Sequence, residues 1–324
     1  MIDLVAEQSP LGGLERWLHD PTVTELMVNA GSEVWVERAG RIEHVGSIRT
    51  ATLLSAIEHI LSTIGRRLDR THPMVDARLA DGSRLCAVVH PIAVDGPCLS
   101  IRRFSVHPFS LEHFASPPVA RLLRELVERR CNMLVSGAAS SGKTTLLNAL
   151  AREVDPGARI ITLEDVAELR LAHPHVVRLE TREATPDGVG EVTLGHLLRT
   201  ALRMRPDRLI IGEIRGNEAV HLLQALNTGH DGSLATVHAN SAHDALERLS
   251  SLVLHEANNW PLVAVQQHVT RAIDAVVHVT RQANGARRVE EVAEVLAATV
   301  NGTAATRTLA TGDTVTDTLQ RGRR

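Results

Sequence analysis

Short apolar stretches alternate with helical spacing in the first third of the chain. Apolar residues over 11–18 and again over 52–68 recur at intervals that place them on one face of a helix. Between the two lie TVTELMVN, VWVER and RIEHVG, which alternate as strands do, the last two joined as a hairpin through Ala39-Gly40. A second hairpin turns at the DG of DARLADGSRLCAVV, and the strand CLSIRRF follows. Helices mixed with antiparallel hairpins predict a small α+β domain over residues 1–104.

The pattern changes after a proline-containing stretch. Residues 105–118, SVHPFSLEHFASPP, hold three of the thirteen prolines and are predicted to be a linker. A helix (ARLLRELVERR), a buried strand (NMLVS), another helix and the strand RIITL come next. Strands that alternate with helices indicate a parallel sheet with crossovers, and therefore an α/β domain over 119–300. The threonine-rich end, 301–324, is predicted to be a peripheral appendage.

The loop after the strand NMLVS carries the clearest chemistry. It matches G-x4-G-K-[ST] and precedes the helical TLLNALARE, which is the expected context for a phosphate-binding loop. Lys143 is expected to reach the β- and γ-phosphates of a nucleotide, and the Thr144 hydroxyl to ligate Mg²⁺. Backbone N–H groups of the loop and the helix dipole complete the phosphate site. The candidate nucleotide-binding residues are Gly137, Ala138, Ala139, Ser140, Ser141, Gly142, Lys143, Thr144 and Thr145.

Acidic side chains follow two further apolar strands. RIITL ends in Glu164-Asp165, and DRLII ends in Gly212-Glu213, the form of a Walker B strand in which glycine stands where many ATPases carry a Mg²⁺-binding aspartate. Ligands of open α/β sheets bind at the carboxyl ends of the strands. Glu164 and Glu213 are therefore candidate catalytic bases, and together with Asp165 and Thr144 they are candidates to hold Mg²⁺ directly or through water. The alternative for Glu164-Asp165 is a pair of acids that stabilise a helix N-terminus through the helix dipole. The alternative for Glu213 is a glutamate that follows a buried strand and has no catalytic role.

Two histidines, His230 and His238, flank a glycine-containing turn and a short strand in TGHDGSLATVHAN. Zinc is disfavoured because no cysteine or carboxylate set with ligand spacing completes the pair. Beside a phosphate loop, a histidine at a strand end is expected to sense the γ-phosphate or to couple neighbouring sites. The alternative is a core or surface histidine, and the chain has 17 of them.

Composition narrows the remaining classes of function. The formal net charge is 35 − 38 = −3, so no overall electrostatic attraction to nucleic acid is expected. Only six residues are aromatic, which leaves few side chains on which bases could stack. Three cysteines are too few for a disulfide framework or a zinc ribbon, so a reducing compartment is expected. No apolar run approaches the length of a membrane span.

Four elements in fixed order carry a family resemblance: GAASSGKTT, RIITLEDVAEL, ALRMRPDRLIIGEIRGNEA and NTGHDGSLATVHANS. They resemble the Walker A, Asp box, Walker B and His box of the secretion-superfamily ATPases, which power type II and type IV secretion and type IV pili. LRMRPDRLIIGEIRG and TGHDGSLATVHAN look most like the CpaF/TadA branch, which drives tight-adherence (Flp) pilus assembly. With VTELMVNAGSEVWVERAGRI upstream, the resemblance covers about Leu14 to Glu294.

The resemblance implies a RecA-like C-terminal domain, a PAS-like N-terminal domain and a homohexamer that hydrolyses ATP with Mg²⁺ between the two domains. It assigns N-terminal arginines to the phosphates, here Arg84 and Arg102, with Arg103 as the near alternative. The segment that holds Arg199, Arg203, Arg205 and Arg208 lies near the subunit boundary in this family, so a contact in trans is possible there. Solvated surface arginines are the alternative in both places.

The same resemblance implies inner-membrane platform proteins as partners. It places the protein in the cytoplasm, peripherally at the inner membrane, and no nucleic acid is expected. Two rival functions stay open from the residues themselves. One is a nucleic-acid motor, which stimulation by DNA would favour. The other is a nucleotide-dependent scaffold, which ATP binding without turnover would favour.

Overall fold

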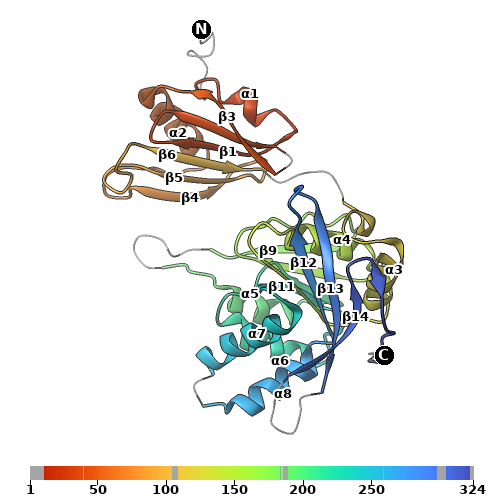
Figure 1. Cartoon of the computed structure of the whole chain (residues 1–324). Coiled ribbons are helices and arrows are strands. Elements are labelled where there is room, and N and C mark those ends of the chain that lie inside the picture. Colours follow the sequence, from red (N-terminus) through yellow and green to blue (C-terminus); the bar gives the residue numbers. More distant parts are fainter. Residues whose placement is uncertain are drawn as a thin grey trace. The chain divides into compact units, whose positions relative to one another are not determined.

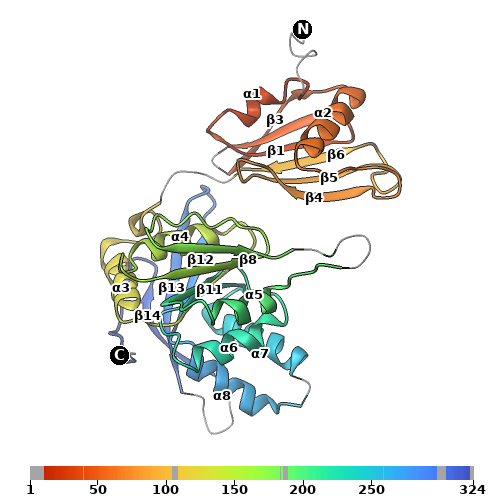
Figure 2. The same ribbon diagram turned by 180° about the vertical axis from the view of Figure 1, so that it is seen from behind.

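The computed structural model describes residues 11–38, 40–103, 109–182, 184, 189–257, 259–297 and 304–321. The chain divides into two compact units, Met1–Val106 and His107–Arg324, drawn in Figure 1 and from behind in Figure 2. No helix in the described part of the chain combines the length and the apolar character that a membrane crossing requires.

The first unit is an antiparallel sheet with one long helix. Its elements are α1 (Glu15–Leu18), β1 (Val23–Asn29), β2 (Glu33–Arg38), β3 (Arg41–Ser47), α2 (Thr50–Thr63), β4 (Met74–Arg78), β5 (Arg84–Val88) and β6 (Cys98–Arg102). The strands run in the order β3-β2-β1-β6-β5-β4. Leu53, Ile57 and Leu61 on α2 are buried against strand residues such as Leu26 and Ile101.

Both predicted hairpins form in this unit, β2–β3 and β4–β5, although Ala39 itself lies outside the described residues. The α+β expectation is therefore met. The predicted first helix is much shorter than 11–18, because only Glu15–Leu18 is α-helical and the preceding residues 11–14 form turns.

The second unit is built on a mixed nine-stranded sheet in the order β15-β14-β13-β12-β7-β11-β10-β8-β9. Strands β12 to β9 in that order are parallel, and β13, β14 and β15 continue the sheet antiparallel. Its elements are η2 (Leu111–His113), α3 (Pro117–Glu128), β7 (Met133–Gly137), α4 (Lys143–Arg152), β8 (Ile160–Glu164), β9 (Val176–Glu180), α5 (Leu194–Ala201), β10 (Arg208–Ile211), α6 (Glu218–Leu226), β11 (Leu234–His238), α7 (Ala242–Glu256), α8 (Leu262–Ala272), β12 (Ala275–Arg281), β13 (Arg287–Leu296), β14 (Ala305–Thr311) and β15 (Thr314–Val315).

Helices cover both faces of this sheet, as the two views show. Successive residues of a strand face opposite sides. Leu134 on β7 accordingly packs with α5, α6, α7 and α8, whereas its neighbours Met133 and Val135 pack with α3 and α4. Burial on both faces explains why the strands are continuous apolar runs rather than alternating ones. The α/β expectation for this region is confirmed.

Two predicted boundaries differ from the structure. Residues 105–108 of the predicted linker lie outside the described residues, but Leu111 and Phe114 are buried in the core of the second unit. The end of the chain is no peripheral appendage over 304–321. Strand β14 pairs with β13, Leu309 and Leu319 are buried, and the Arg321 Nε lies 2.8 Å from Asp274 Oδ1. The prolines led to the prediction of a linker and the threonines to that of an appendage, although both segments contain apolar residues that are buried in the core.

Candidate functional site

The phosphate loop connects β7 to α4, as its motif predicts. Lys143, the first residue of α4, is only 7% exposed, and its Nζ donates hydrogen bonds to the carbonyl oxygens of Gly137 (3.0 Å) and Ala138 (2.9 Å). Thr144 and Thr145 follow in the first turn of the helix. The ammonium is thus held at the mouth of the loop, beside the helix N-terminus where anions are stabilised.

His238 connects the phosphate loop to the second acidic strand. It ends β11, the strand next to β7, with its Nδ1 3.1 Å from Lys143 Nζ and its Nε2 3.1 Å from Glu213 Oε1. A lysine ammonium only donates, so Nδ1 accepts and Nε2 carries the hydrogen. Burial and the charge of Lys143 lower the pKa of His238, in keeping with a neutral ring. Lys143, His238 and Glu213 therefore form one continuous polar chain.

Glu213 is ionised and held by a residue that the sequence reasoning missed. The Nε and Nη2 of Arg215 donate to its two carboxylate oxygens at 2.6 and 2.9 Å. Burial alone would raise the pKa of Glu213, but the bonds from Arg215 and the nearby positive charges outweigh it, so the pKa lies below its ordinary value. Asp165 lies 4.0 Å from Arg215 Nη1. The feature of the sequence that could have identified Arg215 is its position two residues after Glu213.

Glu164 is the opposite kind of carboxyl group. It is 2% exposed, and its Oε1 accepts the backbone N–H groups of Glu168 and Leu169, both at 2.8 Å. Its Oε2 is buried and has no hydrogen-bond partner among the described residues. Burial raises the pKa of Glu164 to about 7, although the two N–H bonds oppose the shift. A carboxyl oxygen without a partner in an apolar setting is costly unless a ligand engages it.

The glycine at the Walker B position is explained by Glu164. A Cβ built on Gly212 would lie 2.9 Å from Glu164 Cγ, so the Glu164 side chain takes the space that an aspartate at position 212 would need. A carboxyl group from the neighbouring strand β8 thus lies beside the position where many ATPases carry one on the Walker B strand. In the part of the chain that the structure describes, no cluster of three or more His, Cys, Asp or Glu residues could hold a metal ion by itself.

His230 is not part of this group. It precedes β11, at the opposite edge of the sheet from His238, and its Nδ1 lies 3.1 Å from the carbonyl oxygen of Ala225 near the end of α6. Within one chain it is therefore not placed to sense a γ-phosphate beside Lys143, and its other expected role, coupling neighbouring sites, stays a prediction. The sequence analysis placed a short strand between the two histidines but did not use it to assign them to opposite edges of the sheet.

The candidate arginines of the first unit lie in one row. Arg84 on β5 pairs in register with Arg102 on β6 and with Arg78 on β4, which sequence reasoning missed although the two flank the DG turn symmetrically. Residues directly opposite in a sheet project from the same face. Arg103 is instead tied within its own unit, its guanidinium donating to the carbonyl oxygens of Asp20 and Val23.

The arginine-rich segment 199–208 contains two kinds of residue. Arg199, Arg203 and Arg205 are exposed, and Arg199 Nη1 lies 2.7 Å from His221 Nε2. Arg208 is 5% exposed and donates to the carbonyl oxygens of Gly232 and Val127, both at 3.0 Å. It is a structural residue, so the contact in trans considered for it is excluded.

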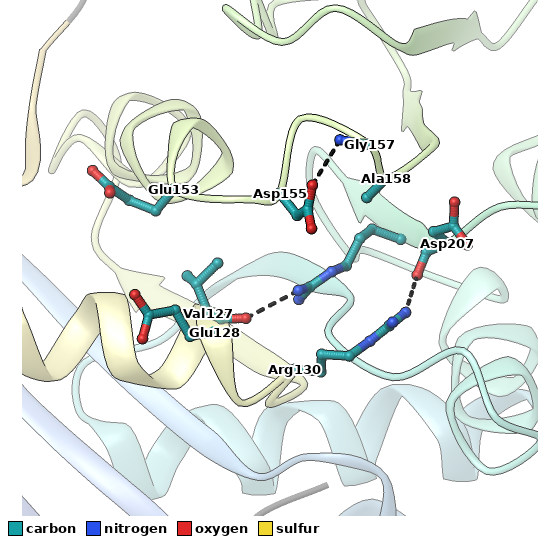
Figure 3. A pocket seen from close by; sticks show the side chains of 9 residues that line it. Val127, Glu128, Arg130, Glu153, Asp155, Gly157, Ala158 and Asp207 are labelled. Atoms are coloured by element: carbon teal, nitrogen blue, oxygen red, sulfur yellow. Dashed lines mark hydrogen bonds between the residues drawn. The ribbon is translucent and has the colours of Figure 1, made fainter. Parts of the chain in front are cut away.

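A cavity of about 570 Å³ lies beside Arg208, lined by Val127, Glu128, Arg130, Glu153, Asp155, Gly157, Ala158, Asp207 and Arg208. Figure 3 shows the guanidinium of Arg130 directed at the Asp207 carbonyl oxygen, a bond of 3.0 Å. The lining loops precede β8 and β10, so the cavity lies at the amino edge of the parallel strands. Ligands of such sheets bind at the other edge, where the phosphate loop, Glu164 and Glu213 are.

Relatives of the chain share most of its length. The family model described as "Type II/IV secretion system protein" matches residues 7–322. A Mycobacterium tuberculosis protein named for conjugal transfer is 38% identical over 305 residues, which cover 90% of this chain and 86% of that protein. The conjugal transfer protein TrbB of Rhizobium radiobacter is 32% identical over 86% and 85% of the two chains. The type IV secretion system protein VirB11 of Brucella suis is 32% identical over 82% and 83%.

Solved structures give the same picture at the level of the fold. The Legionella pneumophila ATPase DotB aligns with a TM-score of 0.59 at 18% identity, covering 93% of this chain and 80% of that one. The pilus retraction motor PilT with bound ADP aligns with a TM-score of 0.58 at 18% identity, covering 94% and 83%. The mixed α/β architecture with a second, sheet-rich domain is common to all three.

Proposed function

The chain belongs to the type II/IV secretion system protein family, and from that premise we propose that it is an ATP-hydrolysing hexameric motor of a secretion or pilus assembly system. Within the family we propose the CpaF/TadA branch, on the strength of LRMRPDRLIIGEIRG and TGHDGSLATVHAN. The PAS-like character of the first unit is part of the same proposal.

One observation carries the proposal: Lys143, His238 and Glu213 form a continuous polar chain at the carboxyl edge of the sheet, beside the phosphate loop. The β- and γ-phosphates would replace the carbonyl oxygens that Lys143 now bonds. Glu213 orients the attacking water and accepts its proton. His238 contacts both Lys143 and Glu213, so a change in the hydrogen bonds of Lys143 is transmitted to Glu213 through the imidazole ring.

The residues present also fit Mg²⁺. In nucleotide sites this ion binds through one or two carboxylates, phosphate oxygens and water. Glu164 Oε2 is a buried carboxyl oxygen without a described partner, next to the glycine that replaces the usual ligand. We therefore assign Glu164 and the Thr144 hydroxyl to the ion, with Asp165 acting through water. The bound ion neutralises charge on the phosphates, and its presence would favour ionised Glu164.

The arginine row of the first unit is assigned to the same reaction. Arg84 and Arg102 would contact the phosphates when the two units close over the nucleotide, as arginine forks bind phosphate in two-point contacts. Arg78 joins them because it shares their register. Exposed Arg199, Arg203 and Arg205 are candidates to reach a neighbouring subunit.

The motor is proposed to act on inner-membrane platform proteins from the cytoplasmic side, and no role in nucleic-acid binding is proposed.

The proposed hexameric motor is tested by measuring phosphate release against protein concentration, together with the oligomeric mass with and without nucleotide. If subunits assemble by mass action, activity rises faster than linearly, and mixing in Lys143→Ala protein inhibits beyond simple dilution. A linear dependence with a monomeric mass in saturating ATP would overturn the ring motor. Stimulation by DNA rather than by a platform protein would favour a nucleic-acid motor.

A further inference from the structure

A second positive side chain lies against the phosphate loop, and it comes from a distant part of the sequence. Arg287 is the first residue of β13, which pairs with β12, and β12 lies beside β7, the strand that leads into the loop. Its Nη1 donates to Thr145 Oγ1 at 3.3 Å. The family motifs do not include this position, which lies 142 residues after Thr145.

The stem of Arg287 lies directly across Gly142. A Cβ at position 142 would be 2.5 Å from Arg287 Cδ and 3.2 Å from its Cγ and Nε. Gly142 also has φ +101°, a conformation that other residues rarely adopt. The glycine is therefore required twice, once for the turn of the loop and once for the approach of this side chain. The Arg287 side chain therefore packs directly against the phosphate loop.

The side of the helix on which Arg287 lies indicates which phosphate it serves. Residues of an α-helix are about 100° apart, so Lys143 and Thr145 face roughly opposite sides of the first turn of α4. Lys143 faces His238 and, through it, Glu213, where the transferred phosphoryl group is expected. Arg287 lies on the Thr145 side, away from that chemistry. The α-phosphate is the charged part of a nucleotide that does not take part in the reaction.

We propose that Arg287 binds the α-phosphate of the nucleotide from within the same subunit. This rests on the proposed function only in that the phosphate loop holds a nucleoside diphosphate or triphosphate. A phosphate oxygen is a stronger acceptor for a guanidinium than the Thr145 hydroxyl, because the bond is charge-assisted on both sides. Since the α-phosphate is bound equally before and during hydrolysis, Arg287 contributes uniform binding: it lowers Kd and KM and leaves kcat unchanged.

The test separates binding by the charge from support of the loop by the stem. Arg287→Met keeps an unbranched apolar stem over Gly142 but removes the guanidinium, and Arg287→Lys keeps a positive charge. Arg288→Met is the matched control, because the neighbouring Arg288 pairs with Asp313 on a different part of the surface. Equilibrium Kd values for ADP, ATP and AMP are measured with a fluorescent nucleotide in competition, alongside kcat and thermal unfolding without nucleotide.

We expect Arg287→Met to weaken ADP and ATP by the same factor, at least about tenfold for a charge-assisted bond, with AMP also weakened. Arg287→Lys should be intermediate, kcat should stay within about twofold, and Arg288→Met should match wild type. Wild-type affinity for ADP in Arg287→Met would overturn the proposal, as would weakening of ATP alone, which would place the contact at the γ-phosphate. Failure of the wild-type protein to bind ADP at all would instead overturn the proposed function.

Discussion

The two edges of the parallel sheet in the second unit both bury polar side chains, but they treat them in opposite ways. At the amino edge, Asn132 is fully buried and every polar atom of its side chain is bonded: Oδ1 accepts from the backbone N–H groups of Gly232 and Ser233, and Nδ2 donates to the Ala272 carbonyl oxygen. At the carboxyl edge, Glu164 keeps a buried oxygen without a described partner, and its pKa is raised to about 7.

The difference is the one expected if the amino edge serves stability and the carboxyl edge serves the proposed chemistry. A satisfied polar network such as that of Asn132 fixes the positions of strand ends. A carboxyl group that is left partly unbonded costs folding free energy and is ready for a ligand. The cavity beside Arg208 does not change this assignment, because the Arg208 guanidinium is already bonded to two backbone carbonyl oxygens. Substitutions at the two edges should therefore separate activity from stability.

The largest expected effect is at the phosphate loop. Lys143→Ala should reduce ATP turnover by about 1,000-fold or more, because the β- and γ-phosphates lose a preorganised positive charge. Thermal unfolding without nucleotide should change little. Phosphate release and thermal unfolding measured on the same preparation check both statements. Turnover within about tenfold of wild type would remove the assignment of the loop as the catalytic phosphate site.

The next effect concerns the two acids. Glu213→Gln should bind ATP and hydrolyse it at least about 100-fold more slowly, since only the carboxylate charge is lost. Glu164→Gln should be similarly slow but should also need more Mg²⁺ for half-maximal rate. Glu128→Gln, an exposed acid at the amino-edge cavity, is the control and should behave as wild type. Normal turnover in Glu213→Gln with an inactive Glu164→Gln would move the base to β8.

At the amino edge the effect should be on folding. Asn132→Ala removes three buried hydrogen bonds, those from the N–H groups of Gly232 and Ser233 and that to the Ala272 carbonyl oxygen, which should cost about 3 kcal/mol of unfolding free energy. Denaturant unfolding measures it, and the protein that remains folded should bind ATP normally. Asn227→Ala, which removes one partly buried bond from an exposed residue to the Leu223 carbonyl oxygen, should cost less than about 1 kcal/mol. Equal costs for the two variants would contradict the structural role of Asn132.

The smallest expected effect is a gain in the stability of Glu164→Gln relative to wild type as the pH rises. The pKa of Glu164 is about 7 in the folded chain against an ordinary 4.5, so the folded state binds this proton more tightly and loses stability as the pH rises through that range. Glu164→Gln has no proton to lose. Its unfolding free energy, relative to wild type, should therefore rise by about 2 kcal/mol between pH 5 and pH 8. A difference that does not vary with pH would contradict the raised pKa.

The sequence reasoning reached most of the carboxyl edge because its side chains follow strands in fixed motifs. The phosphate loop, Glu164 and His238 lie at strand or helix ends that the apolar runs predicted, and Glu213 follows the end of β10 by two residues. His230 was grouped with His238 although the two lie on opposite sides of a predicted strand, which places them at opposite edges of the sheet. Arg215 was missed because spacing alone does not show that its guanidinium folds back onto the Glu213 carboxylate, two residues away. Arg287 was missed because it contacts the phosphate loop from a distant part of the sequence.

The amino edge and the chain ends were harder to predict for a different physical reason. The bonds of Asn132 run to the backbone of residues about 100 and 140 positions away, and backbone groups leave no mark in the sequence. Strand β14 was read as a frayed end because threonine, which favours strands, is also common in loops. The PAS-like character of the first unit, the hexamer and the platform partners stay predictions.

Hydrogen exchange with and without ADP and Mg²⁺ tests the contrast between the two edges most directly. We predict that nucleotide slows exchange in peptides that contain the phosphate loop, the N–H groups bonded by Glu164 and the residues after Gly212. Peptides that contain Asn132, Asp207 and Ser233 should be slow already and unchanged. Protection confined to the loops around the amino-edge cavity, with none at the phosphate loop, would contradict the assignment of the carboxyl edge as the nucleotide site.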